Sequence, residues 1–309
     1  MKTGLLLDEV YLTSINSRSH PENPERLKAI IDKLGNNDIR NRLLSIDLIY
    51  TETEILKAID AVHSENHIKA IQSANKIYQA ATNAVAGVIT AIDYVMKGKC
   101  ENAFCAVRPP GHHAHNNGLH YEGRNQGQGF CYFNNIAAGA KYLQSQYSCR
   151  NILIIDWDFH HGNGTEWSFY SDPHVFFFST HALHTYPGTG FASGRGEGKG
   201  LGYNLNIPLP DFADDKCMFS AWENDFLPGL SDLGFRPDFI LISAGFDSRE
   251  QDYLGNFLLT DYCFARLTQI VKKMAAEYCQ NRIVSVLEGG YNPAGLASAV
   301  YAHLNALSE

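Results

Sequence analysis

The sequence lacks the features that mark disulfide-linked, membrane-spanning and nucleic-acid-binding proteins. Its seven cysteines are odd in number and form no Cys-x-x-Cys pair, which argues against a disulfide framework and favours a reducing compartment. No stretch approaches the roughly 18 apolar residues of a membrane span. The net charge is −8, from 25 Lys and Arg against 33 Asp and Glu, so we expect no direct contact with nucleic acid.

The chain also lacks internal repeats, low-complexity tracts and linkers. The opening MKTGLLLDEVYLT has one lysine and an apolar run shorter than that of a signal peptide, so we expect a cytoplasmic protein without membrane contact. Hydrophobic residues make up 45% of the 309 positions, enough for a sizeable core. We therefore predict a single domain over residues 1–309.

Short apolar runs alternate with amphipathic stretches along the whole chain. Strands are predicted at residues 4–9, 103–107, 151–156, 175–179, 204–209, 238–245 and 283–290. Helices are predicted after the cap Asn23, in two pieces over 53–75, and at 76–98, 136–147, 219–230 (interrupted near Pro228), 261–278 and 293–307. This alternation predicts an α/β fold whose mostly parallel central sheet has helices on both faces.

Unusual polar groups follow four of the predicted strands. They are RPPGHHA at 108–114, DWDFHHGNG at 156–164, SAGFD at 243–247 and EGGY at 288–291. Ligands bind beyond the carboxyl ends of the strands in open α/β sheets, so we expect the four groups to meet at one edge.

Two carboxylates and one imidazole among these groups form a candidate metal site. Side chains alternate along a strand, so Asp156, Asp158 and His160 share a face if the extended chain continues. Asp158, His160 and Asp247 would give three ligands and leave a position for water and substrate, as in a catalytic zinc site. A solvated strand end explains any one of them alone, whereas their convergence favours a metal.

Other residues of the four groups are candidates for acid–base chemistry. His112 and His113 could act as base and electrostatic helper. Asp156 could orient His112 or face a monovalent ion. Tyr291 could donate a hydrogen bond to an oxyanion, although a packed core tyrosine is the simpler interpretation of that fragment alone.

As a set, these motifs resemble the zinc-dependent histone deacetylase superfamily, most closely its class II members and bacterial deacetylase-like amidohydrolases. The motifs are RPPGHHA, GFCYFNN, DWDFHHGNGT, PGTG, SAGFDSREQDYLGNFLLT and EGGYN, in that order. The resemblance runs from about Asp8 to the last helix. It implies an arginase-like fold, one catalytic Zn²⁺ and hydrolysis of Nε-acyl-lysine in a protein or peptide, with histone tails among the candidate substrates.

The resemblance also implies residue roles. Asp158, His160 and Asp247 correspond to the zinc ligands, His113 to the general base and His112 to its electrostatic partner. The remaining catalytic residues are Tyr291 as the transition-state donor, with Asp156 and Asn163 behind the two histidines. The implied tunnel walls are Gly129, Phe130 and Tyr186. The implied K⁺ sites are an inner one at Asp156, Asp158, His160, Ser179 and Thr180, and a second at Phe169, Asp172, Val175 and Tyr203.

Some positions depart from the family pattern. Asn163 replaces the Asp of class I enzymes, as it does in class II, and Tyr186 adds a hydroxyl to a tunnel wall that is usually Phe. Residues 115–128 form a longer connection, rich in Gly and Asn, that we expect at the pocket rim. Its His115 and His120 could be extra ligands, but solvated loop histidines are the simpler interpretation. The short stretch 63–78 shows no match to the loop whose Asp holds the substrate backbone in many relatives.

Three alternatives remain open at the level of sequence. An acetylpolyamine deacetylase would restrict its tunnel with an insertion or an acidic gatekeeper, and Glu122 could be that acid. A catalytically silent binding module would keep the fold without the chemistry, but the complete set of ligands, base and tyrosine argues against it. An arginase-type enzyme with two manganese ions needs further carboxylates near DWDFH, which are not found.

Overall fold

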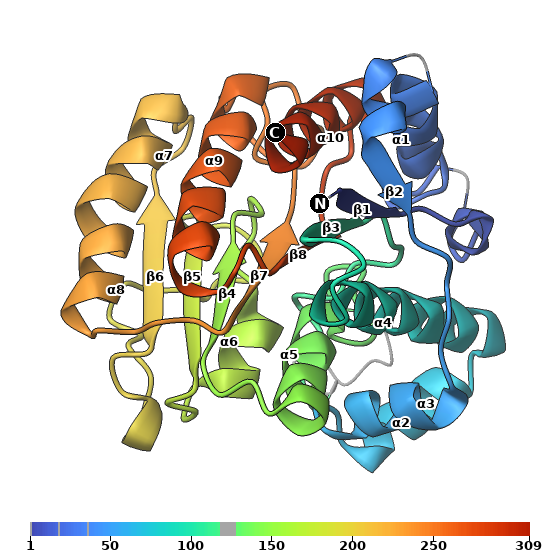
Figure 1. Cartoon of the computed structure of the whole chain (residues 1–309), viewed down its shortest axis with the longest axis horizontal. Coiled ribbons are helices and arrows are strands. Elements are labelled where there is room, and N and C mark those ends of the chain that lie inside the picture. Colours follow the sequence, from blue (N-terminus) through green and yellow to red (C-terminus); the bar gives the residue numbers. More distant parts are fainter. Residues whose placement is uncertain (1, 18, 36, 118–127) are drawn as a thin grey trace.

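Eight parallel strands form one sheet in the part of the chain that the structure describes (Figure 1). The structure is a computed structural model, and it describes residues 2–17, 19–35, 37–117 and 128–309. The strand order is β2-β1-β3-β8-β7-β4-β5-β6. The strands are β1 (Thr3–Leu6), β2 (Leu43–Ser45), β3 (Asn102–Cys105), β4 (Ile152–Asp156), β5 (Val175–Ala182), β6 (Asn204–Leu209), β7 (Phe239–Ala244) and β8 (Ile283–Leu287).

Helices cover both faces of the sheet (Figure 1). One layer holds α1 (Glu25–Gly35), α7 (Asp215–Ala221), α8 (Leu227–Asp232), α9 (Asp261–Tyr278) and α10 (Pro293–Ser308). The other holds α2 (Glu52–Asp60), α3 (Glu65–Gln72), α4 (Asn75–Met96), α5 (Asn135–Tyr147) and α6 (Asn163–Phe169). Strands β3, β4, β7 and β8 are buried at every position, which explains their near-continuous apolar runs. The predicted α/β fold with a parallel sheet is confirmed.

The structure corrects three details of the predicted elements. β2 was missed because it has only three residues and lies at the sheet edge, where its burial falls off along the strand. The seven-residue helix α6 was also missed, since Gly162 and Gly164 interrupt any apolar periodicity there. The helix predicted at 219–230 begins at Asp215, and its irregular turn is a π-helical segment, Trp222–Phe226, that precedes Pro228. Proline lacks the N–H that a regular helix would use there.

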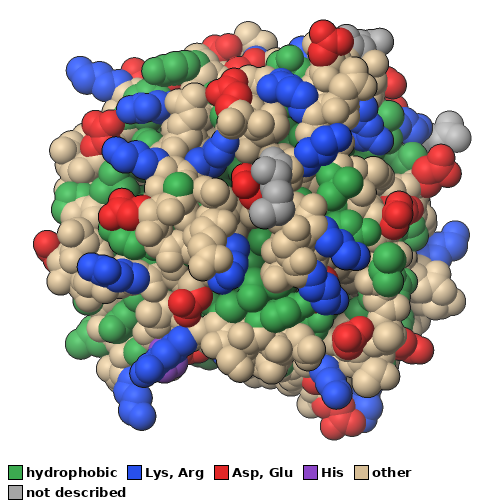
Figure 2. Space-filling view, viewed as in Figure 1, with side chains coloured by type: hydrophobic (Ala, Val, Ile, Leu, Met, Phe, Trp, Pro, Cys, Tyr) green, Lys and Arg blue, Asp and Glu red, His purple; other side chains and the backbone are tan. Residues whose placement is uncertain are grey.

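The first helix is capped as predicted. Oδ1 of Asn23 accepts a hydrogen bond from the backbone N–H of Glu25 at 2.9 Å, and Pro24 stands between them. No described helix is long and apolar enough to cross a lipid bilayer. Figure 2 shows basic and acidic side chains interspersed over one face of the molecule, so the net charge of −8 is not gathered into a single patch there.

The sheet order explains where the functional groups lie. β3, β8, β7 and β4 are neighbours in that order, and each is followed by one of the four polar groups found in the sequence. Because all four strands are parallel, their carboxyl ends lie side by side at one edge. The polar groups are therefore brought together by strand order, although up to 180 residues separate them along the chain.

Candidate active site

Asp158, His160 and Asp247 form a compact cluster of metal-donor atoms beyond β4 and β7. One donor atom from each residue lies within 4.8 Å of the others. Nδ1 of His160 is 2.9 Å from Oδ2 of Asp247 and 3.3 Å from Oδ1 of Asp158. Both carboxylates are buried, and the imidazole is largely so. Two hard oxygen ligands and one nitrogen ligand fit a divalent ion such as zinc.

Backbone amides hold the two carboxylates in place. Oδ2 of Asp158 accepts from the N–H of Gly289 at 2.8 Å, and Oδ1 of Asp247 accepts from the N–H of Phe159 at 2.9 Å. A Cβ on Gly289 would lie 2.3 Å from Oδ2 of Asp247, so only glycine allows this close approach. The ligand oxygens are thus positioned before any ion binds.

The electrostatics of the cluster also suit a cation. Burial and the negative charge of Asp158 raise the pKa of Asp247 to about 7. Burial alone would lower the pKa of His160, but hydrogen bonds to both carboxylates raise it to about 10. The two buried carboxylates therefore favour a positive charge between them, which a divalent ion would supply.

His112 is paired with a buried carboxylate. Its Nδ1 donates to Oδ2 of Asp156 at 2.9 Å, and its Nε2 is 3.8 Å from Oδ1 of Asp158. Burial alone would lower the pKa of His112, but the charges of Asp156, Asp158 and Glu288 outweigh it and raise the pKa well above its usual value. His112 thus carries a proton in this arrangement.

His113 has the opposite environment. Its Nδ1 is 2.9 Å from Oδ1 of Asn163, an amide oxygen that only accepts hydrogen bonds. Burial, followed by the charges of His112 and His160, lowers the pKa of His113 well below its usual value. The ring is therefore neutral, with its proton on Nδ1 and a lone pair on Nε2, as a general base requires. Opposite pKa shifts in the two adjacent histidines separate their roles.

Tyr291 lies beside the metal-donor cluster, at the end of β8. Its backbone N–H donates to Oδ2 of Asp252 at 2.6 Å, and the guanidinium of Arg26 lies 5.0 Å from its ring centre. Burial raises the pKa of the phenol well above its usual value, so the hydroxyl keeps its proton. A protonated phenol can donate to an oxyanion.

The three predicted tunnel residues lie beside the catalytic candidates His113 and Tyr291. The ring of Tyr186 is 4.9 Å from that of His113, and the ring of Phe130 is 5.8 Å from that of Tyr291. Gly129 has a φ of +50°, and a Cβ there would lie 2.3 Å from Cδ2 of His113. One aromatic ring therefore lies beside the candidate base and the other beside the candidate phenol, and Gly129 keeps the backbone close to the base.

The predicted inner monovalent-cation site lies under His112. Residue pairing between β4 and β5 sets Asp156 opposite Ser179. Oγ1 of the next residue, Thr180, is buried with no hydrogen-bond partner among the described residues. Side chains alternate along a strand, so the Thr180 hydroxyl lies on the face of β5 opposite to that of Ser179 and Asp156. A cation beside Asp156 would therefore be held by its carboxylate and by backbone oxygens.

The second predicted cation site is more nearly satisfied by the protein itself. Phe169, Asp172, Val175 and Tyr203 lie where α6 meets the start of β5 and the approach to β6. Oδ2 of Asp172 is already 3.4 Å from Nζ of Lys141, which lowers its need for a bound ion. An ion at this second site would therefore be held mainly by backbone carbonyl oxygens.

The loop histidine His115 is neither a ligand of the cluster nor solvated. It is 7% exposed, its ring lies 4.6 Å from that of Trp167, and its N–H donates to Oε1 of Gln128. The expectation of a solvated histidine is therefore wrong at this position, because His115 packs against Trp167 of α6. His120 and Glu122 lie outside the described residues.

The short stretch 63–78 contacts the backbone of His115 through His63. Nε2 of His63 accepts from the N–H of Asn134 at 2.9 Å, and its Nδ1 donates to the carbonyl of His115 at 3.2 Å. The stretch contains no Asp. It therefore supports the turn before α5, and its one carboxylate, Glu65, forms an exposed ion pair with Lys69.

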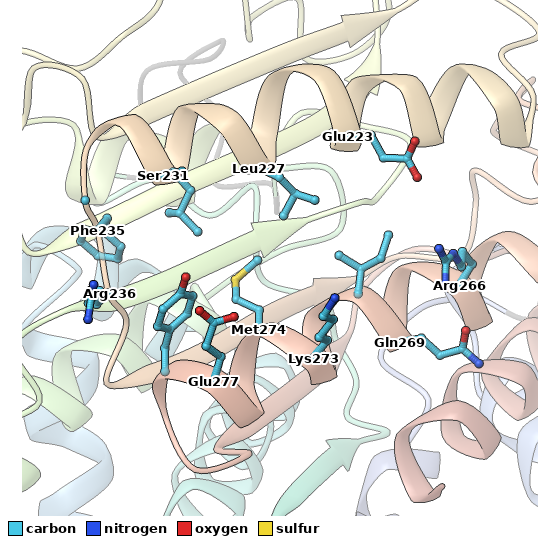
Figure 3. Close-up of a pocket in the computed structure, with 14 residues that line it drawn as sticks. Glu223, Leu227, Ser231, Phe235, Arg236, Arg266, Gln269, Lys273, Met274 and Glu277 are labelled. Atoms are coloured by element: carbon cyan, nitrogen blue, oxygen red, sulfur yellow. The ribbon is translucent and has the colours of Figure 1, made fainter.

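A groove of about 480 Å³ between α8 and α9 lies away from these residues (Figure 3). It is lined by mixed charges such as Glu223, Arg266 and Lys273, and by an apolar floor that includes Phe235 and Met274. Residues 234–236 precede β7, so the groove opens toward the amino ends of the strands. The catalytic candidates lie at the opposite ends.

Sequence reasoning missed three residues that support the site. Arg26 donates from Nε to the carbonyl of Gly290 at 2.6 Å and from Nη2 to that of Glu288 at 2.5 Å. Asp252 holds the backbone of Tyr291, as above. Glu288 stands in the EGGY motif, but its residue type alone suggests no role. Glu22 and Arg26 form a buried i,i+4 ion pair, and their spacing was the feature of the sequence that could have indicated Arg26.

The fold and the site define a class of α/β protein with a set of metal-donor residues at the carboxyl edge of a parallel sheet. The histone deacetylase domain profile matches residues 20–307, and the chain belongs to the histone deacetylase family. Family membership implies a deacetylase-type hydrolase with a metal cofactor.

Individual relatives agree with this placement. The chain is 36% identical to a probable deacetylase of Archaeoglobus fulgidus over 96% of this chain and 83% of that protein. It is 35% identical to the chloroplastic histone deacetylase 10 of Oryza sativa subsp. japonica, over 92% and 69% of the two chains. The crystal structure of the HDA15 HD domain superposes with a TM-score of 0.85 at 31% identity, over 99% of this chain and 90% of that one. The expected arginase-like fold is thereby confirmed.

Proposed function

We propose that the chain is a zinc-dependent hydrolase that removes the acetyl or another acyl group from Nε-acyl-lysine in a protein or peptide. The observation that carries this proposal is the donor cluster of Asp158, His160 and Asp247 beside a neutral histidine, His113. A metal site alone would also suit a structural ion. The adjacent base, together with a protonated phenol, supports hydrolysis instead.

The residues of the chain divide the chemistry among them. Zinc bound at the cluster would polarise the substrate carbonyl and acidify a water molecule. His113 takes the proton of the attacking water on Nε2, since its Nδ1 proton is held by Asn163. Tyr291 donates its hydroxyl proton in a hydrogen bond to the oxygen that becomes negative. The proton on His113 then passes to the leaving lysine amine, so the products are a carboxylate and an amine.

Other residues prepare these steps. His112 keeps its proton because Asp156 lies 2.9 Å away, and its charge stabilises the oxyanion. Phe130 and Tyr186 would hold the apolar stem of the acyl-lysine and exclude water from the reacting amide. By family resemblance, K⁺ at the inner cation site would fix Asp156 and the carboxyl end of β4.

One screen tests the proposal. The zinc-loaded protein is incubated with acyl-lysine peptides of increasing acyl length, among them histone-tail peptides, and with N8-acetylspermidine. A parallel arm contains a chelator. We expect acyl-lysine peptides to be hydrolysed and the chelator to abolish turnover. Preference for N8-acetylspermidine would favour an acetylpolyamine deacetylase over a protein deacetylase. Binding of these compounds without turnover would favour a binding module over an enzyme.

A further inference from the structure

The carboxylate of Glu288 lies directly beneath the two histidines, at the end of β8. It is fully buried, and its Oε2 accepts the backbone N–H of Gly111 at 2.7 Å and that of His112 at 3.2 Å. Its Oε1 accepts from Oγ of Ser243 at 3.3 Å. One carboxylate thus satisfies two consecutive amides of the turn that presents His112 and His113.

The residue after Glu288 is bonded to the other half of the site. The N–H of Gly289 donates to Oδ2 of Asp158, one of the candidate zinc ligands, at 2.8 Å. The side chain of Glu288 therefore binds the histidine turn while the adjoining backbone binds a metal-ligand carboxylate. The segment sets the distance between base and metal through two adjacent residues of one chain.

The carboxylate of Glu288 is fully buried, and the charge of His112 acts on it at short range. A carboxylate oxygen of Glu288, a ring nitrogen of His112 and the thiol of Cys131 all lie within 4.8 Å of one another. Burial raises the pKa of Glu288 to about 7. A carboxylate and a neutral carboxylic acid both accept amide hydrogen bonds. The two contacts of Glu288 with the amides of Gly111 and His112 therefore depend on the length of its side chain more than on its charge.

We propose that Glu288 is a positioning residue for the hydrolysis, a buried clamp on the Gly111 and His112 amides that fixes His112 and His113 relative to the metal site. This inference rests on the proposed function for its kinetic consequences. Its structural consequence, protection of the two amides, is independent of any activity. A displacement of about 1 Å at a catalytic group can cost about 100-fold in rate.

Two substitutions of Glu288 separate the effect of side-chain length from that of charge. Glu288→Gln keeps the length and a carbonyl oxygen for the two amides, and its NH₂ can donate to Ser243. Glu288→Asp keeps the charge but is one methylene shorter, so it retracts from both amides. We expect kcat per zinc-loaded molecule to stay within about 5-fold of wild type for Gln and to fall about 30- to 100-fold for Asp, with little change in KM.

Ser285→Ala serves as a matched control on the same strand. Ser285 is equally buried, but its Oγ contacts Nε2 of His303 at 2.8 Å and the carbonyl of Ala103 at 3.4 Å, away from the histidine turn. We expect it to lower the melting temperature and leave kcat unchanged. A purely structural role for Glu288 would give its Asp variant the same result as this control.

Hydrogen exchange of the amides of residues 108–114 completes the test. We expect protection to be lost in Glu288→Asp and kept in Glu288→Gln, whether or not the protein hydrolyses any substrate. If the amides stay protected in both variants, the positioning role of Glu288 is contradicted. It is also contradicted if kcat for Glu288→Asp is within 3-fold of wild type in an active enzyme. If wild type hydrolyses nothing, the proposed function fails, and exchange alone decides the clamp.

Discussion

Nδ1 of His160 lies 2.9 Å from Oδ2 of Asp247, although the two residues follow different strands and are 87 positions apart. The short distance joins the ends of β4 and β7, which are neighbours in the sheet. It also creates a buried pair of carboxylates around one imidazole, with Asp158 as the third member.

Asp247→Asn should abolish stoichiometric zinc binding while leaving the protein folded. The amide oxygen can still accept the N–H of Phe159, so the local backbone is kept, but the negative charge that a divalent ion needs is gone. Elemental analysis together with circular dichroism measures both properties. Asp211→Asn, on the loop after β6 where Oδ1 accepts from Asn256, is the control and should keep its zinc. Retention of one zinc per chain in Asp247→Asn would contradict the assignment of Asp247 as a zinc ligand.

Tyr291→Phe should fold and bind zinc but lose most of its turnover. Loss of one oxyanion donor typically costs about 10²–10³ in kcat, and a transition-state contact changes kcat more than KM. Steady-state kinetics on an acyl-lysine peptide checks this. Tyr142→Phe is the matched control, because Tyr142 is equally buried and its hydroxyl donates to Asp93 far from the site. A kcat within a few-fold of wild type for Tyr291→Phe would refute the catalytic role.

Asn163→Asp should shift the acidic limb of the pH profile to higher pH. A carboxylate 2.9 Å from Nδ1 of His113 favours the charged ring and so raises the pKa of His113. The base must be neutral to accept a proton, so activity would require a higher pH before it appears. The profile of kcat/KM against pH measures the shift, with Asn41→Asp, at an exposed position, as the control. An unmoved limb would show that another group controls it.

Gly129→Ala should weaken both turnover and hydroxamate inhibition. Its Cβ would lie 2.3 Å from Cδ2 of His113 and 2.8 Å from Cε1 of Tyr186, so the base and one aromatic wall must move. Gly98→Ala is the control, because Gly98 also has a positive φ, of 67°, but no atom within 4 Å of the added Cβ. Its kcat should be normal, and any loss of stability measures backbone strain alone.

Hydroxamates should inhibit the wild-type protein at micromolar concentration, since a bidentate chelator on an apolar stem suits an open metal site between aromatic walls. Dose–response curves on wild type and Gly129→Ala together test this. Equal inhibition of the two proteins would mean that Gly129 does not shape the route to the metal. An absence of inhibition in wild type would mean that the route between Phe130 and Tyr186 does not admit such a stem.

Local sequence determined much of this protein. Apolar runs of four to eight residues indicate seven of the eight strands, because burial on both faces removes polar residues from them. The polar groups that follow those runs make Asp158, His160, Asp247, His112 and His113 candidates by residue type and position after a strand, whereas Tyr291 became a candidate only through the family resemblance. These features need no knowledge of distant contacts.

The tertiary structure alone decided how those residues meet. The order β3-β8-β7-β4 is not the chain order, and it sets Glu288 beneath His112 and Asp247 against His160. The register of β4 against β5 sets Asp156 opposite Ser179. Arg26 reaches the backbone of Glu288 across 262 positions. Local propensity and alternation carry no information on strand order, register or such long-range hydrogen bonds, because these depend on how whole layers of helices and strands pack around one core.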